Sequence, residues 1–129
     1  MGEPFFLDFQ AVEKLHRDSL AKFGGLAGVR DQPGIESAIA AAMNCHAYAS
    51  ADLFDIAATY AFHIAQAQAF LDGNKRTGAA AALSFLQIND ITTWPEGEEL
   101  YDAMIAIAEK RLDKAGLAAL FRRAANSAS

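Results

Sequence analysis

A short turn in the middle of the chain carries the residues best suited to chemistry. Asp72, Gly73 and Asn74 form the turn, and Lys75 and Arg76 follow it directly. We expect a helix to begin near Asn74, and the first N–H groups of a helix lack partners and carry partial positive charge. Two cations at that end oppose the helix dipole, and a bound phosphate would offset them. The pattern therefore indicates a phosphate-binding loop.

Asp72 and Asn74 add two further functional groups to this loop. The carboxylate of Asp72 suits Mg²⁺, which commonly binds one or two carboxylates together with the phosphates of a nucleotide. The amide of Asn74 can donate to a phosphate or cap the helix. An Asp-Gly-Asn turn before a helix is also an ordinary structural feature, so the residues alone leave both interpretations open. A Walker A loop is excluded because Asn74 separates Gly73 from Lys75 and no upstream glycine has the required spacing.

The segments around this turn have the pattern of helices. Apolar residues recur at spacings of three and four, and the one β-branched stretch is too short to define a sheet. We predict an all-α fold of about six helices around a central helix that starts near Asn74 and is apolar nearly all round. The other helices are expected after Asp8, from Pro33 to Met43, from Asp52 toward Gln68, after a Thr93–Glu96 capping box with Pro95 in the first turn, and after Asp113. Residues 44–50 are expected to form a loop or a short hairpin.

Composition limits the class of protein. A chain of 129 residues that is 53% hydrophobic has the size of one domain, over residues 1–129, with a substantial core. The single cysteine, Cys45, cannot form an internal disulfide and is typical of a reducing cytoplasm. No basic leader precedes an apolar segment, and no apolar run approaches the ~20 residues that span a bilayer. A net charge of −5 argues against a general nucleic-acid surface. We therefore expect a cytoplasmic protein without membrane or direct nucleic-acid contacts.

The segment from Ala61 to Thr77 resembles the signature of the Fic/Doc family, H-x-F-x-(D/E)-G-N-(G/K)-R. Lys75 matches the Doc branch, the death-on-curing toxins of toxin–antitoxin systems, rather than the AMP-transferring Fic proteins. The similarity covers nearly the whole chain and continues at Leu15 to Asp18, Gly24-Gly25, Gly28 to Asp31 and Ile35 to Ala38. The resemblance implies a compact helical Fic/Doc domain.

The resemblance also implies an activity, with ATP and Mg²⁺ as cofactors. Asp72 would hold the Mg²⁺, and Gly73 to Arg76 with the Asn74 amide would form the phosphate nest, where Lys75 and Arg76 neutralise charge. Doc proteins transfer the γ-phosphoryl of ATP to a threonine of elongation factor Tu, which arrests translation. Residues 44–52 would take the place of the family's flap, which docks the target peptide. The implied partner is a Phd-like antitoxin whose C-terminal segment folds onto the toxin.

Gln68 departs from the family at the position of the catalytic histidine. The amide of glutamine has no titration near neutral pH and cannot accept the proton of an attacking hydroxyl. Loss of a general base typically costs about 10²–10⁴ in rate, so we expect little or no catalysis. Three explanations stay open: a deliberate inactivating substitution, a natural pseudoenzyme, or another histidine acting as the base.

Several other residues have structural interpretations that compete with functional ones. His16, His46 and His63 are each expected to be structural, and His63 to be packed or half-buried. Met43 and Met104 are expected in the core, and Arg122-Arg123 at a solvated helix end. Two other functions remain possible: a non-catalytic module that binds nucleotide or antitoxin, and an AMP-transferring enzyme, which Lys75 disfavours.

Overall fold

The computed structural model describes residues 3–48 and 50–126, and these form six helices and no strand. The helices are α1 (Phe9–Phe23), α2 (Gln32–Tyr48), α3 (Leu53–Ala67), α4 (Asn74–Ile88), α5 (Gly97–Ala108) and α6 (Lys114–Asn126). The predicted all-α fold is confirmed, and the helix expected near Asn74 begins at that residue. No helix of the described residues is long and apolar enough to cross a membrane.

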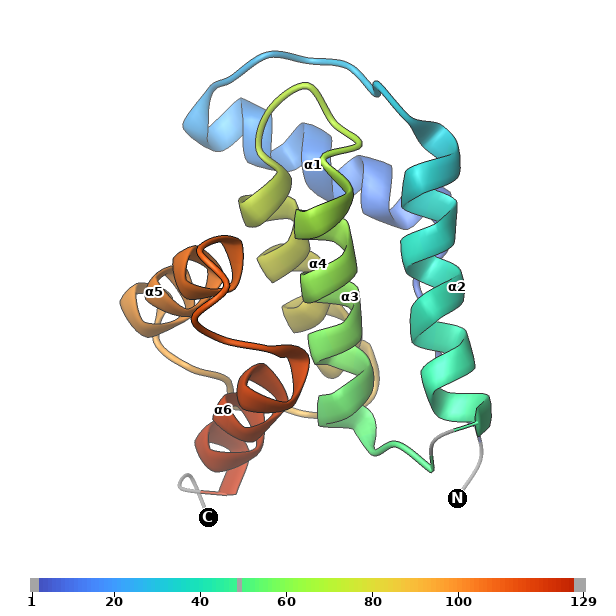
Figure 1. The fold of residues 1–129 in the computed structure, drawn as a ribbon, viewed down its shortest axis with the longest axis vertical. Helices are drawn as coiled ribbons and strands as arrows, with labels where there is room; N and C mark the ends of the chain where they lie inside the picture. The colour runs from blue at the N-terminus through green and yellow to red at the C-terminus, as the bar shows by residue number, and fades with distance from the viewer. Residues whose placement is uncertain (1–2, 49, 127–129) are drawn as a thin grey trace.

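The α3–α4 hairpin forms the centre of the bundle (Figure 1). α3 packs against α2, α4, α5 and α6, whereas α4 packs against α1, α3 and α5. α3 is therefore the more enclosed helix, with a buried run from Ile56 to Ala61. α4 buries one face only and leaves Lys75 exposed and Leu83 half-buried. α4 is a central helix, as predicted, but it is not enclosed on every side, because much of its alanine-rich surface stays partly open.

A close approach of α3 and α4 depends on Gly78. A Cβ at this position would lie 2.7 Å from the main-chain oxygen of Ala61, so only glycine lets the two backbones come this near. The core around this contact includes the fully buried Tyr60, Phe85 and Phe121. The hairpin is thus fixed at mid-length, and its end carries the loop between α3 and α4.

Two helix boundaries differ from the sequence prediction. α2 continues through residues 44–48, which were expected to form a loop, and its last turn packs His46 against Phe6 with ring centroids 5.9 Å apart. Tertiary packing outweighs the weak local periodicity there. α5 begins at Gly97 with Glu96 as a cap that makes no side-chain bond, so the predicted Thr93–Glu96 capping box is absent. Pro95 precedes the helix instead of lying in its first turn, and it is buried.

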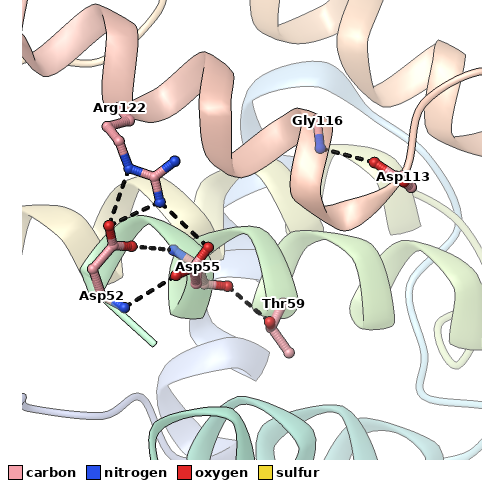
Figure 2. Close-up of polar contacts among 6 residues, drawn as sticks. All are labelled: Asp52, Asp55, Thr59, Asp113, Gly116 and Arg122. Atoms are coloured by element: carbon pink, nitrogen blue, oxygen red, sulfur yellow. Dashed lines mark hydrogen bonds and ion pairs between the residues drawn. The ribbon is translucent and has the colours of Figure 1, made fainter. Parts of the chain in front are cut away.

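Arg122 ties the C-terminal helix to the start of α3 (Figure 2). Its guanidinium donates to Asp52 at 2.8 Å and to Asp55 at 3.3 Å, and these two aspartates also form the capping box of α3. Burial raises the pKa of Asp52, but hydrogen bonds from the Asp55 main chain and from Arg122 outweigh it and lower the pKa. Arg122 is therefore not the solvated residue that we expected, although its neighbour Arg123 is exposed.

Other single-residue predictions have mixed outcomes. Asp8 and Asp52 cap α1 and α3 as predicted, and Asp113 accepts from Gly116 at the start of α6 (Figure 2). Met104 is buried, as expected of a core residue. Met43 is 48% exposed, because it lies on the outer side of α2.

Candidate functional site

The candidate site is the loop between α3 and α4, residues 68–73, which we call the motif loop. Gln68 ends α3 in the left-handed region (φ 51°), and Gly73 precedes α4 in the same region (φ 76°). These two residues reverse the chain and aim the N-terminus of α4 at the loop surface. Gly73 is the N-cap of α4 and provides no side-chain cap, so no side chain caps the first-turn N–H groups.

The side chain of Asn74 stabilises the conformation of the motif loop through two hydrogen bonds to the Phe70 main chain. Its side chain is buried, its Oδ1 accepts from the Phe70 N–H at 3.0 Å, and its Nδ2 donates to the Phe70 carbonyl at 3.0 Å. The sequence left open whether Asn74 caps the helix or donates to a phosphate. In the structure the amide is engaged with Phe70, and Gly73 occupies the cap position. Asn74 therefore stabilises the loop from its buried side and does not present its amide at the surface.

The loop between α1 and α2, residues 24–31, lies directly against the motif loop (Figure 1). The N–H groups of Arg30 and Asp31 donate to the Ala69 carbonyl, and the Leu71 N–H donates to the Gly28 carbonyl at 3.1 Å. Val29 and Phe70 form an isolated antiparallel bridge. The two loops thus make one paired surface.

The segment 44–52, which the resemblance places as the flap, does not lie at this surface in its described residues 44–48 and 50–52. Residue 49 lies outside the described residues. Residues 44–48 form the end of α2, and residues 50–52 come just before α3, whose 15 residues separate Asp52 from the motif loop. At 1.5 Å per residue the separation along the helix is about 22 Å. The residue pattern did not indicate that the α1–α2 loop lies at the site, because its pairing with the motif loop joins segments some 40 residues apart.

Asp72 presents an ionised carboxylate at the surface of the motif loop. Its Oδ1 accepts from the Gly73 N–H at 2.8 Å, and its Oδ2 accepts from the Leu26 N–H at 3.3 Å. These two main-chain bonds, with smaller contributions from Arg76 and His16, lower the pKa of Asp72. The carboxylate is charged at neutral pH and can serve as a hard oxygen ligand.

This donor set fits Mg²⁺ better than a metal held by protein alone. Within residues 3–48 and 50–126 no group of three or more His, Cys, Asp or Glu side chains could hold a metal ion. Mg²⁺ commonly binds one or two carboxylates and takes its remaining ligands from phosphates and water. Asp72 beside an uncapped helix N-terminus supplies the protein part of such a site.

The two cations of the motif lie in different environments. Arg76 turns toward the end of α1, where it donates to Ser19 Oγ at 3.1 Å and to the Gly24 carbonyl at 3.0 Å. Its guanidinium also lies 5.4 Å from the Phe23 ring centroid. Arg76 therefore offsets the C-terminal dipole of α1, a partner that the sequence did not reveal. Lys75 is exposed beside the first turn of α4.

Gln68 is exposed, and its side-chain Nε2 donates to the Ala65 carbonyl at 2.8 Å. Neither atom of its amide can take a proton from a hydroxyl near neutral pH. Of the three histidines, His16 lies against the motif loop, but its Nε2 is 2.8 Å from the Asp72 carbonyl oxygen and its ring stacks on Phe70. His46 packs on Phe6 at the far end of α3, and His63 lies 3.2 Å from Lys114 on α6.

His63 is half-buried, as predicted. Burial and the nearby ammonium of Lys114 lower its pKa, so its ring is neutral at physiological pH. His63 lines a surface cavity of about 270 Å³, and a second cavity of about 460 Å³ shares Gln66 with it. Neither cavity is lined by residues 72–76, and the Asp72 and Lys75 side chains are exposed.

Comparison with known proteins gives two matches that include this site. A model described as the Fic/DOC family matches residues 6–86, a span that includes α1, the α1–α2 loop and the motif loop. The chain is also 33% identical over 115 residues to "Protein kinase doc" of Escherichia phage P1. That alignment covers 88% of this chain and 90% of the phage protein.

Proposed function

The chain belongs to the Fic/DOC family, and on that premise we propose that it is a Doc-type toxin that binds ATP and Mg²⁺ but lacks an effective catalytic base. The active form would be a protein kinase that phosphorylates a threonine of elongation factor Tu and so arrests translation. The observation that carries this proposal is the motif loop itself, where the Asp72 carboxylate stands beside the uncapped N-terminus of α4.

The motif loop supplies the groups that a nucleotide would need. The first-turn N–H groups of α4 and the ammonium of Lys75 would bind phosphate oxygens, and Asp72 would hold the Mg²⁺. The metal ion would neutralise charge on the phosphates when bound. Arg76 would contribute positive charge from its place at the end of α1, and Asn74 would keep the loop in shape through Phe70. Phosphoryl transfer depends mostly on such positioning and charge stabilisation.

The paired surface also offers a place for the protein substrate. We propose that the α1–α2 loop, rather than residues 44–52, docks the target segment. Leu26, Val29 and Leu71 are exposed there, and the loop contacts the Asp72 carboxylate through the Leu26 N–H. A threonine bound along this loop would lie beside the phosphates. The further expectations of a Phd-like antitoxin partner and a cytoplasmic location belong to the same proposal.

The function can be tested by restoring the missing base. Gln68→His protein, incubated with ATP, Mg²⁺ and elongation factor Tu, is expected to form phosphothreonine at a rate about 10²–10⁴ above that of the unmodified chain. Gln66→His is the matched control, because it adds a histidine to the same helix two residues away from the family position. Mass spectrometry of elongation factor Tu measures the product.

The possible results separate the candidate functions. Phosphoryl transfer with Gln68→His and not with Gln66→His supports the kinase. An adenylyl adduct would assign AMP transfer instead. A folded Gln68→His variant that gives no adduct contradicts the kinase and leaves a non-catalytic binding module.

A further inference from the structure

His16 is the one histidine that contacts the motif loop within residues 3–48 and 50–126. It lies on α1, is 98% buried, and shares the inward face of that helix with Val12 and Ser19. A buried histidine is costly unless its ring nitrogens find partners and its ring packs well. The His16 ring lies against the motif loop and contacts two of its residues, Phe70 and Asp72.

Two contacts define that place. The His16 ring stacks on the Phe70 ring with centroids 3.8 Å apart and planes inclined by 13°. Its Nε2 lies 2.8 Å from the main-chain oxygen of Asp72. Because a carbonyl oxygen only accepts hydrogen bonds, Nε2 must carry the proton and act as the donor. His16 thus fixes both the aromatic anchor of the loop and the peptide group of Asp72.

The bond to Asp72 constrains the carboxylate as well as the main chain. The Asp72 carbonyl belongs to the peptide group that also contains the Gly73 N–H, and this N–H donates to the Asp72 carboxylate. Fixing the peptide plane therefore fixes the direction of the N–H that orients the carboxylate. His16 also packs under Gly73, where a Cβ would lie 3.7 Å from its Cδ2.

We propose that His16 is a positioning residue that sets the orientation of the Asp72 carboxylate toward a bound divalent cation. It acts through the main chain of the motif loop and does not touch the substrate. The inference rests on the proposed role of Asp72 in holding the Mg²⁺ of a nucleotide. Ser19, the next inward residue of α1, accepts a hydrogen bond from the Arg76 Nε through its Oγ at 3.1 Å. One face of α1 thus positions two residues of the motif.

Two substitutions separate the ring of His16 from its hydrogen bond. His16→Phe keeps an aromatic ring to stack on Phe70 but removes the donor. His16→Gln places an amide Nε2 the same number of bonds from Cα as the imidazole Nε2, so it keeps a donor without the ring. His63→Phe is the control, because His63 contacts Lys114 on α6 and has no bond to the motif loop.

Two measurements report the effects of these substitutions. Amide hydrogen exchange at Phe70 and Leu71 reports the order of the motif loop without any ligand, and calorimetry with Mg²⁺ and a non-hydrolysable ATP analogue reports binding. Loss of one hydrogen bond changes an equilibrium by roughly tenfold. We expect His16→Phe to speed loop exchange and weaken analogue binding by about that factor, while His16→Gln and His63→Phe stay near the unmodified chain.

The outcomes distinguish this inference from the proposed function. If His16→Phe has unchanged loop exchange, or if His16→Gln and His16→Phe lose order equally, the positioning role is overturned. If the unmodified chain binds no analogue, the proposed nucleotide site fails, and the exchange measurement still decides whether His16 orders the loop. Thermal unfolding of each variant shows whether the change is local or global.

Discussion

At the scale of single residues, Asp72 is positioned by main-chain and side-chain groups from two distant parts of the sequence. The Leu26 N–H binds its carboxylate, and His16 binds its carbonyl. The sequence identified Asp72 as the candidate metal ligand but not these two supporting groups. The position of His16 on the inward face of α1 was a usable signal, because it lies four residues after Val12 and three before Ser19. The role of Leu26 was not predictable, since every residue except proline has a main-chain N–H and the residue type does not show where it donates.

Gly25 lets the α1–α2 loop come close enough to bind Asp72. A Cβ there would lie 2.8 Å from Asp72 Oδ2, and its φ of +124° is strained for other residues. We expect Gly25→Ala to lower the free energy of unfolding by about 1–3 kcal/mol and to weaken binding of Mg²⁺ and an ATP analogue. Urea unfolding and calorimetry measure the two effects.

The neighbouring glycine provides the control. Gly24 also has a positive φ, +82°, but a Cβ there would meet nothing within 4 Å. Gly24→Ala should have a similar backbone cost of about 1–3 kcal/mol and weaken analogue binding less than Gly25→Ala does, because Gly24 contacts Arg76 and not Asp72. Equal loss of affinity in the two variants would show that crowding of Asp72 is not the cause.

At the scale of elements, most helices and caps were predictable because their signals are local. Asp8, Asp52 and Asp113 cap helices through bonds to residues three positions later. The failures arose where distant contacts decide the local structure. The last turn of α2 is stabilised against Phe6, and the pairing of the α1–α2 loop with the motif loop depends on how α1 packs against α4. Neither contact can be predicted from the spacing of residues within one segment, because each joins residues that are distant in the sequence.

The close approach of α3 and α4 at Gly78 can be tested by substitution. Alanine is normally favoured over glycine inside a helix by about 1 kcal/mol. At Gly78 the added methyl group would lie 2.7 Å from the Ala61 carbonyl oxygen, so the helices must separate. We expect Gly78→Ala to lower the free energy of unfolding by about 1–3 kcal/mol. Thermal or urea unfolding measures this change.

Gly97 is the matched control for that substitution. It is the first residue of α5, and a Cβ there would meet nothing within 4 Å. Gly97→Ala is expected to be neutral or to stabilise by up to about 1 kcal/mol. If Gly78→Ala is also neutral, the close approach of α3 and α4 does not constrain the hairpin.

At the scale of the whole molecule, the sequence predicted the all-α class and the number of helices, and the family followed from the motif. It did not predict which loops meet, because that depends on packing of the complete bundle. α1 packs against α4, and this contact brings His16, Ser19 and Gly25 to the motif loop. The candidate site is therefore a property of the folded domain and not of the motif segment alone. Gln68 lies at the end of α3 in this arrangement and has no group that titrates near neutral pH.

We propose that the chain binds ATP and Mg²⁺ without transferring the phosphoryl group. Calorimetric titration of the unmodified protein with ATP and Mg²⁺, alongside Asp72→Asn, tests it most directly. Asn keeps an oxygen for the Leu26 N–H but loses the charge that binds the cation. We predict saturable, Mg²⁺-dependent binding to the unmodified chain and at least about tenfold weaker binding to Asp72→Asn, the factor expected from a lost charged contact. No binding to the unmodified chain, or equal binding to both proteins, would contradict the account.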